Sequence, residues 1–355
     1  MKSLSSLIFI TSLVFANSLF AGGSSELKKT ITLMAYNIEN LFDTTHDEGK
    51  DDYTYLPLSV KKASKEAMDF CRAQSVPMYR EQCFTLNWDE NILNKKIQNI
   101  SKVIRDFNNG KGPDVLVVQE VENLSVLTKL RDQGLSDLGY KTVVLIEGPD
   151  KRGVDVGLIS RFPLKDAKIH IVNMSNTKGM EGISKQTRPI LEVTLRVDGK
   201  LLTVFVNHWP SQSNPDSDRL MAAQTLLSAV QNLSNPNVIA AGDFNTSDDD
   251  VQNGLRDLIL NESTDPHFVD SRLVNHKPSA VPGSHCYRGE WAYLDKILTL
   301  AKDDSAISNV EFTVYTPSYI LKLNPKFKKL EPFRFDATTG EGYTDHMPIT
   351  MTFKF

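Results

Sequence analysis

Polar side chains that could carry chemistry recur along the chain directly after short apolar, β-branched runs. The positions concerned are Asn37, Glu120, Asn207-His208, Asp243 with Asn245, and Asp345-His346. Carboxylates, amides and imidazoles are the side chains of general acid–base and electrostatic catalysis. A rigid sheet fixes such groups at strand ends, and the loops that follow leave them accessible. The pattern therefore indicates one candidate active site at the edge of a sheet.

Each of these features has a plainer explanation when it is taken alone. An asparagine that ends a strand is usually a turn residue, and Glu120 could be a carboxylate in the first turn of a helix. His208 alone would more often be a packed or surface histidine. Gly242–Asn245 after an apolar run is more specific, although Gly-Asp also marks ordinary turns. The five features in this order are what favour a shared site.

The elements that must position these residues are short strands alternating with helices. The predicted strands are Ile31–Tyr36, Val115–Gln119, Thr142–Ile146, Val154–Ile159, Ile190–Val197, Leu201–Val206, Val238–Ala241, Leu294–Leu300 and Ile349–Phe353. Apolar spacing of three and four predicts helices over 97–107 and 220–230. Asp198-Gly199 joins two adjacent strands as a hairpin. Hairpins mixed with crossover helices predict an α/β (α+β) fold, with sheets packed face to face and helices outside.

The motif set resembles the endonuclease/exonuclease/phosphatase superfamily, which includes the deoxyribonuclease I-like enzymes. The matching segments are Asn37, Gln119-Glu120, Gly153–Arg161, Asn207-His208, Gly242–Asn245, Tyr293–Lys296 and Thr344–Pro348. Asn37–Asp43 and Tyr287–Trp291 look like exported bacterial nuclease-type members. The resemblance implies one domain over 28–355, built as a four-layer sandwich of two packed mixed β-sheets flanked by helices.

The resemblance implies a divalent-metal site and a histidine beside it. Glu120 matches the principal metal ligand, with Asn37 and Asp345 completing the metal environment. Hard oxygen ligands suit Mg²⁺ or Mn²⁺. His346 would act as general base or stabilise the pentacovalent phosphorane, with Asp295 hydrogen-bonded to its imidazole.

The resemblance also assigns residues to the water and the phosphate. Asp243 would orient the attacking water, and Asn245 would hold a non-bridging oxygen. His208 would bind phosphate or protonate the leaving oxygen, with Asp155 as its carboxylate partner.

Two arginines would contact phosphate, and one position departs from the pattern. Arg188 precedes a strand where relatives place a phosphate-contacting arginine, and Arg288 is a second candidate. Trp291 would stack a base or pack under the next strand. Abasic-site endonucleases of the superfamily carry a tyrosine where this chain has Gly153, which argues against DNA repair.

The expected activity is that of a secreted, Mg²⁺-dependent phosphodiesterase, an endonuclease acting on DNA and/or RNA. The partner expected is its nucleic acid substrate, with no stable membrane association and no obligate protein partner. A sphingomyelinase-like lipid phosphodiesterase would need an exposed apolar hairpin, for which Tyr315–Leu323 is the nearest candidate. An inositol or sugar phosphate phosphatase and a non-catalytic binding protein are further alternatives. The sequence holds no GxSxG, P-loop or HExxH motif, which argues against serine hydrolases, P-loop NTPases and zincins.

The first residues are typical of a secretory signal. Lys2 gives a basic start, Leu7–Phe15 is apolar apart from two polar residues, and Ala21 precedes Gly22 and Gly23. Residues 1–21 are therefore predicted to be a signal peptide, and the mature protein to be periplasmic or extracellular. The formal net charge is −4, so polyanion binding would need a local basic patch.

Residues 44–91 are predicted to be an insertion on the scaffold. They show little periodicity and contain Cys71 and Cys83, two of the three cysteines. Export would allow these two to form a disulfide, which leaves Cys286 free or buried. A structural Ca²⁺ ion is compatible with this reading.

Overall fold

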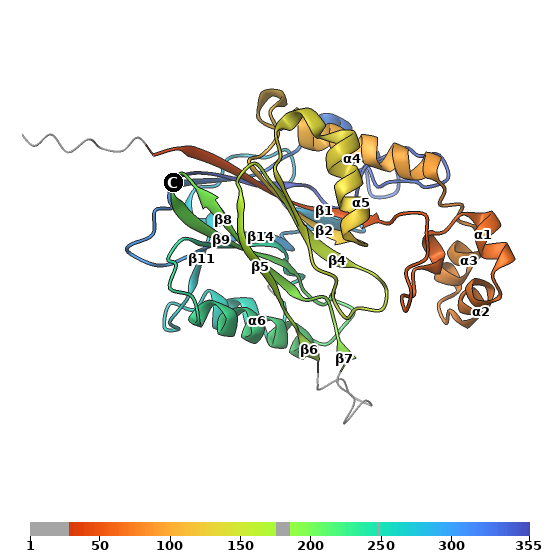
Figure 1. Ribbon diagram of the computed structural model, residues 1–355, viewed down its shortest axis with the longest axis horizontal. Coiled ribbons are helices and arrows are strands. Elements are labelled where there is room, and N and C mark those ends of the chain that lie inside the picture. Colours follow the sequence, from red (N-terminus) through yellow and green to blue (C-terminus); the bar gives the residue numbers. More distant parts are fainter. Residues whose placement is uncertain (1–27, 175–184, 248) are drawn as a thin grey trace, which may run out of the picture.

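The computed structural model describes residues 28–174, 185–247 and 249–355. The expected signal peptide, residues 1–21, lies outside this part of the chain. Figure 1 shows sheets in the centre of the molecule, with helices α4 and α5 on one side and α6 on the other.

The first sheet is assembled from both ends of the chain. Its strands, in spatial order, are β15 (Ser308–Val314), β18 (Ile349–Lys354), β1 (Thr30–Leu41), β2 (Val115–Val121), β4 (Asp155–Ser160) and β3 (Thr142–Leu145). β1 and β2 run parallel, while β18 and β4 flank them antiparallel. β1, β2 and β4 are buried along almost their whole length, which explains their continuous apolar sequence.

The second sheet also has two parallel central strands flanked by antiparallel ones. Its order is β11 (Phe268–Asp270), β14 (Asp295–Leu300), β10 (Val238–Asp243), β9 (Lys200–His208), β8 (Ile190–Val197) and β5 (Leu164–His170). β9 and β10 are parallel, and β8 and β9 form the hairpin predicted at Asp198-Gly199. β5 was not predicted, because its sequence LKDAKIH is largely polar and mostly exposed.

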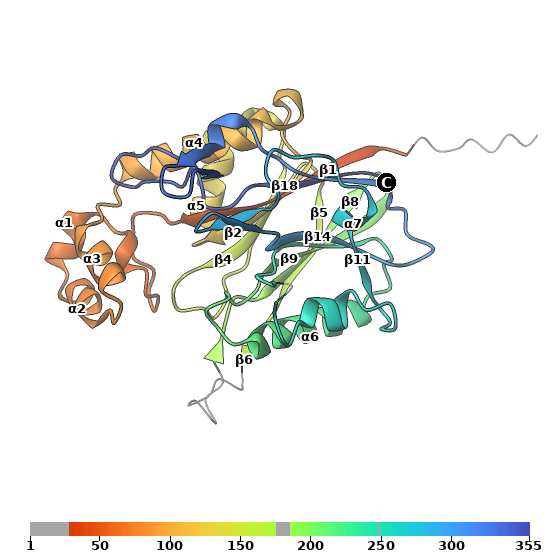
Figure 2. The ribbon, with the colours of Figure 1, turned by 180° about the vertical axis from the view of Figure 1, so that it is seen from behind.

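The two sheets pack face to face and helices cover their outer faces. Leu33, Val117, Val204 and Ile297 lie in the shared core between the sheets, each fully buried. Burying such a side chain contributes about 1.5–3 kcal/mol. Helices α4 (Glu90–Gly110) and α5 (Leu124–Lys129) cover the first sheet, and α6 (Asp216–Gln231) closes a second core over the other. The predicted four-layer architecture is confirmed (Figure 2).

The predicted insertion contains helices that the sequence did not reveal. They are the 3₁₀ turn η1 (Tyr53–Tyr55) and helices α1 (Leu58–Ala63), α2 (Lys65–Ala73) and α3 (Pro77–Thr85), which lie at one end of the molecule (Figure 1). These helices are too short for an apolar period to show. Cys71 and Cys83 form a disulfide between α2 and α3. The buried Lys61 donates to the backbone oxygens of Thr54, Cys83 and Leu86.

The remaining elements are short. Three two-stranded hairpins are β6 (Asn173–Met174) with β7 (Lys185–Gln186), β12 (His285–Tyr287) with β13 (Glu290–Ala292), and β16 (Leu321–Asn324) with β17 (Lys329–Pro332). Short helical turns are η2 (Leu130–Gly134), η3 (Ser136–Leu138), η4 (Leu255–Ile259), α7 (Ser271–Val274) and η5 (Ser318–Ile320). Within the described ranges, no helix has the length and apolarity needed to cross a membrane.

Candidate active site

The topology brings the predicted polar residues to one edge of the two sheets. The parallel strands β1, β2, β9 and β10 carry Asn37, Glu120, His208 and Asp243 near their carboxyl ends. Antiparallel neighbours start at the same edge, so Asp155, Asp295 and His346 lie at or just before the beginnings of β4, β14 and β18. Residues far apart in the sequence therefore converge where the sheets end.

Asn37 lies between two carboxylates. Its Nδ2 is 3.4 Å from Glu120 Oε1 and 3.3 Å from Asp243 Oδ2, and it donates to both. Its Oδ1 accepts from the backbone N–H of Glu39 at 3.1 Å. The backbone N–H of Asn40 donates to Glu120 Oε2 at 3.1 Å. Asn37 was expected as a metal ligand; its amide nitrogen faces the carboxylates, and its oxygen, which has two lone pairs, accepts one hydrogen bond from the backbone.

The backbone at this edge adopts unusual conformations that aim the side chains. Glu120 has a φ of 62°, a left-handed conformation rarely adopted by a non-glycine residue. Gly242 has a φ of 132°, and a Cβ there would lie 2.1 Å from the carbonyl oxygen of Asn207. Only glycine therefore allows β9 and β10 to approach this closely just before Asp243.

His346 and Asp295 form a buried hydrogen-bonded pair. His346 Nδ1 donates to Asp295 Oδ2 at 2.7 Å, and His346 Nε2 points toward Asp243 Oδ2 at 3.9 Å. Burial opposes protonation of the imidazole, but the Asp295 carboxylate outweighs it and raises the pKa of His346 well above its usual value. Burial and the nearby Asp295 raise the pKa of Asp243 to about 7.

His208, on the second sheet, faces the carboxylates of Glu120 and Asp243. Its Nε2 lies 3.8 Å from Glu120 Oε1 and 3.7 Å from Asp243 Oδ2. Burial, reinforced by Arg188 and Arg152, lowers the pKa of His208 well below its usual value. The pKa shifts of the two histidines therefore run in opposite directions, favouring the charged form of His346 and the neutral form of His208.

Four predicted site residues make contacts that the motifs did not predict. Asp155 does not contact His208: its Oδ1 accepts from Gly148 N at 3.0 Å, and its Oδ2 and His208 Nδ1 are both buried without a hydrogen-bond partner. The Asp155 carboxylate is turned into the loop that precedes β4, and this explains the missing pair. Asp345 Oδ2 lies 3.6 Å from Arg334 Nη2 and makes no hydrogen bond to Asn37 or Glu120.

Asn245 and Arg288 are the other two. Asn245 N–H donates to Asp243 Oδ1 at 2.9 Å, and its side-chain amide donates to the backbone oxygen of Trp209 at 3.2 Å. Asn245 therefore orients Asp243 in addition to any contact with phosphate. Arg288 is exposed at the turn of the β12–β13 hairpin and lies outside the hollow formed around Glu120 and His208.

Arg188 lies inside this hollow, which measures about 500 Å³ and is also lined by Glu120, Arg152 and His208. The buried Arg188 guanidinium donates to the backbone oxygens of His208 and Trp209 at 3.1 and 2.7 Å. Arg188 thus fixes the end of β9 and adds positive charge beneath the hollow. Arg152 is more exposed and was not predicted, although it directly precedes the matching segment at Gly153.

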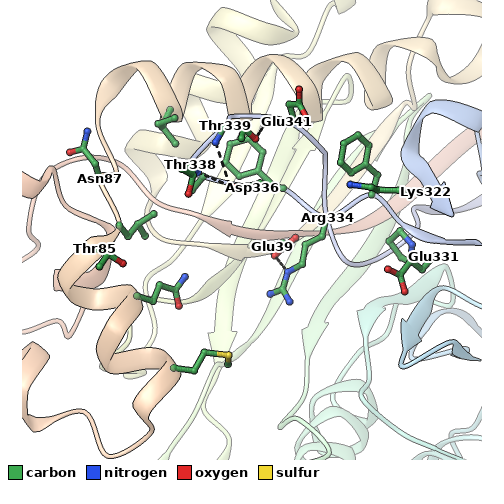
Figure 3. Close-up of a pocket in the computed structure, with 18 of the residues that line it drawn as sticks. Glu39, Thr85, Asn87, Lys322, Glu331, Arg334, Asp336, Thr338, Thr339 and Glu341 are labelled. Atoms are coloured by element: carbon green, nitrogen blue, oxygen red, sulfur yellow. Dashed lines mark hydrogen bonds and ion pairs between the residues drawn. The ribbon is translucent and has the colours of Figure 1, made fainter. Parts of the chain in front are cut away.

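Two further residues beside the site, His285 and Arg334, were missed because no motif marks them. The ring of His285 lies 4.6 Å from that of His346, and the two residues form a β-bridge. Arg334 pairs with Glu39 (Figure 3) and also with Asp345. Only the fold brings these residues to the edge.

The donor set fits a divalent cation. Glu120 and Asp243 both accept from Asn37, yet neither has a lysine or arginine nitrogen of the described chain within 4.0 Å. Ligand atoms of Asp243, Asp295 and His346 lie within 4.8 Å of one another. Uncompensated carboxylate oxygens at a partly buried edge are what Mg²⁺ or Mn²⁺ binds. A second acidic group, formed by Asp47 and Asp52 of the insertion with Glu122 after β2, could also hold a cation.

Comparisons with known proteins agree with this geometry. The profile of the Endonuclease/Exonuclease/phosphatase family matches residues 78–354. No curated protein matches the sequence. Among solved structures, TDP2 from C. elegans is 14% identical with a TM-score of 0.53, covering 93% of this chain and 77% of that one.

Two further solved structures, one of them bacterial, are similar to about the same degree. An endonuclease/exonuclease/phosphatase family protein from Bacteroides thetaiotaomicron is 13% identical with a TM-score of 0.53, covering 92% of this chain and 98% of that one. D. rerio TDP2 complexed with single strand DNA product is 15% identical with a TM-score of 0.50, covering 92% and 99%. At such identities the structures establish the fold, and the profile establishes membership. The chain belongs to the endonuclease/exonuclease/phosphatase family, whose members hydrolyse phosphoric esters with a divalent metal.

Proposed function

We propose that this protein is an exported, Mg²⁺-dependent phosphodiesterase that hydrolyses DNA and/or RNA. The observation that carries the proposal is the convergence of Glu120, Asp243, His208 and His346 at one sheet edge, with both imidazole Nε2 atoms within 4 Å of Asp243 Oδ2. That edge can hold a cation and a phosphoryl group together.

Each residue of the site would have its own role in phosphodiester hydrolysis. Glu120 and Asp243 would hold the cation, which when bound neutralises charge on the phosphate and activates water. Asp243 is fixed by Asn37 and Asn245, so its carboxylate can orient a water for attack on phosphorus. His346, kept cationic by Asp295, donates a hydrogen bond to an equatorial oxygen as negative charge builds there. This favours stabilisation of the phosphorane over general base catalysis as the role of His346.

His208 is placed for the opposite side of the phosphate. As a neutral imidazole it can donate one ring proton to a phosphoryl or leaving oxygen, and its unpartnered Nδ1 is free to accept or donate. Arg152 and Arg188 add positive charge to the hollow beside it. The nucleic acid substrate is further supported by the single strand DNA product bound to D. rerio TDP2, which shares this fold.

Export is supported by two features. Residues 1–21 have the layout of a secretory signal. The Cys71–Cys83 disulfide is of a kind that persists in oxidising compartments such as the periplasm or the extracellular medium.

The proposal is tested by incubating the purified mature protein with plasmid DNA, RNA and sphingomyelin, each with Mg²⁺ and with a chelator. We expect Mg²⁺-dependent cleavage of DNA or RNA and none of sphingomyelin. His346→Ala should reduce the rate on the order of 10²–10⁴-fold. Release of phosphocholine without nucleic acid cleavage would replace this proposal with a lipid phosphodiesterase, and equal inactivity of wild type and His346→Ala on every substrate would end the enzymatic interpretation.

A further inference from the structure

Two β-hairpins lie side by side next to the catalytic histidines. His285, whose ring lies against His346, begins β12, and the turn of this hairpin is three residues further on at Arg288. An extended strand covers roughly 10 Å in that distance. The second hairpin, β16–β17, is held against the first because Lys329 Nζ donates to Gly289 O at 3.0 Å and Trp291 Nε1 donates to Leu330 O at 3.2 Å. Trp291 thus joins the hairpins and is partly buried against the core.

The paired hairpins are strongly basic on a protein that is acidic overall. Five exposed cations, set against the acids Glu290 and Glu331, are Arg288, Lys322, Lys326, Lys328 and Lys329. Only Lys329 is neutralised by an ion pair, to Glu290 at 2.8 Å. The other four cations make no ion pair with any described residue. Exposed cations without ion-pair partners on a chain of net charge −4 form the local patch that a polyanion needs.

Aromatic rings alternate with these cations. Arg288 lies 5.0 Å from the ring centre of Tyr287, Lys326 lies 5.3 Å from that of Phe327, and Lys322 lies 4.8 Å from that of Phe333. Tyr287 is 63% exposed, so its ring can contact a ligand. Cations that bind phosphates, interleaved with rings that stack on unpaired bases, are typical of surfaces that bind single-stranded nucleic acid.

The neighbouring groove does not suit a phosphate backbone. This hollow of about 1330 Å³ separates the β16–β17 hairpin from the insertion helix α3, with Arg334 between them (Figure 3). The acidic residues that line it are Glu39, Glu81, Asp89, Glu331, Asp336 and Glu341. These six acids outnumber Lys322 and Arg334, the cations that also line the groove, so their charge would repel phosphates and direct a strand that leaves the catalytic edge over the hairpins.

A membrane is the other ligand that basic and aromatic hairpins can bind. Leu323 and Leu330 are exposed and lie opposite each other in the hairpin ladder. A hairpin that enters a bilayer would carry its apolar residues at the tip, but the tip here is Pro325–Lys328, with two lysines around Phe327. The distribution of charge therefore favours nucleic acid.

We propose that the paired hairpins β12–β13 and β16–β17 bind the single-stranded part of the substrate next to the scissile phosphate. The inference rests on the proposed function and specifies its substrate as single-stranded nucleic acid. Arg288, Lys322, Lys326 and Lys328 contact phosphates, and Tyr287 stacks on a base. None of these residues belongs to the catalytic edge.

The test compares Lys322→Gln/Lys326→Gln/Lys328→Gln with a matched triple variant at the opposite end of the sheets, Lys111→Gln/Lys141→Gln/Lys165→Gln. Binding of a fluorescent oligothymidylate of about 20 nucleotides is measured in chelator, so that no cleavage occurs. The hairpin variant should bind roughly 10- to 100-fold more weakly, and its plot of log affinity against log salt should be flatter by about 2. The control variant should match wild type in both respects.

A second pair of variants tests the stacking. Tyr287→Ala should weaken binding of the oligothymidylate about 10-fold and binding of a blunt duplex much less, whereas Tyr287→Phe should restore wild-type affinity. Equal losses on single strand and duplex would overturn the specification of single strands.

The small substrate bis(p-nitrophenyl) phosphate, with Mg²⁺, reports on the catalytic edge alone. The hairpin variants should hydrolyse it at the wild-type rate. If they do so and also bind the oligonucleotide like the control variant, the inference is wrong while the proposed function stands. Binding of anionic phospholipid vesicles in place of the oligonucleotide, lost in the lysine variant, would reassign the surface to membranes. If wild type hydrolyses no phosphodiester at all, the proposed function fails, and the binding measurements still decide the inference.

Discussion

Asp295→Asn is the substitution that best separates orientation of His346 from metal binding. Asp295 accepts from His346 Nδ1 at 2.7 Å, and the two residues are 1% and 6% exposed. An amide keeps the size of the side chain and removes the charge that holds the imidazole in its cationic form. The His346 Nε2–H that faces Asp243 would then be a weaker donor, or would be lost through a change of tautomer.

The size of the effect follows from the burial of the pair. Removing one partner of a buried ion pair costs about 3–5 kcal/mol. If about 3 kcal/mol of this is felt in the transition state, kcat falls on the order of 10²-fold. Because Asp295 acts through His346, the Mg²⁺ concentration that gives half-maximal activity should stay as in wild type.

The assay is hydrolysis of bis(p-nitrophenyl) phosphate across a Mg²⁺ titration, with Asp303→Asn as the control. Asp303 is an exposed carboxylate in the loop after β14, at the end of this strand away from the site. Circular dichroism verifies that both variants are folded. A kcat within about threefold of wild type would refute the orienting role, since that difference is under 1 kcal/mol. Recovery of activity at high Mg²⁺ would show instead that Asp295 is a metal ligand.

Three further substitutions test the site and its support. Glu120→Gln should raise the Mg²⁺ concentration for half-maximal activity at least about 10-fold, because it removes an uncompensated carboxylate; an unchanged titration would exclude Glu120 as a ligand. Gly242→Ala should lower the free energy of unfolding in urea by about 3 kcal/mol or more, whereas Gly199→Ala, in an open turn, should cost about 1 kcal/mol. Similar losses would contradict the close approach at Gly242. Lys61→Met should leave three backbone oxygens unpaired, lower the stability of the insertion by about 3 kcal/mol and speed its proteolysis. The exposed Lys62→Met should not change the rate of proteolysis. Equal rates for the two variants would show that Lys61 does not stabilise the insertion.

The fold could be predicted because most of its central strands have a clear apolar pattern in the sequence. Strands β2 and β10 are buried on both faces and therefore read as continuous apolar runs, and the polar residue that ends each run marks the sheet edge. The edge positions of Glu120, Asp243 and His346 followed from this. Elements with little apolar surface, such as β5 and the insertion helices, gave no such signal because other contacts stabilise them.

The sequence could not predict which atom of each side chain faces the site and which is hydrogen-bonded elsewhere. Asp155 occupies the position expected for a partner of His208, yet the loop before β4 turns its carboxylate toward Gly148. Asn37 lies where a ligand was expected. Its oxygen accepts a hydrogen bond from the N–H of Glu39, and its nitrogen faces Glu120. Such outcomes depend on rotamers and local backbone hydrogen bonds, which a motif does not record.

The division between chemistry and recognition also has a physical basis. The catalytic residues lie on long buried strands, whose rigidity keeps atoms such as His346 Nε2 and Asp243 Oδ2 within 4 Å. The cations proposed to bind substrate lie on two-stranded hairpins with little buried surface, where lysines can follow a flexible strand. The overall net charge of −4 opposes non-specific binding, so attraction of a polyanion would depend on local cations such as those of the hairpins that lead to His285 and His346. The proposed nuclease activity is in this way compatible with a net charge of −4, because the substrate would not be held along the whole surface.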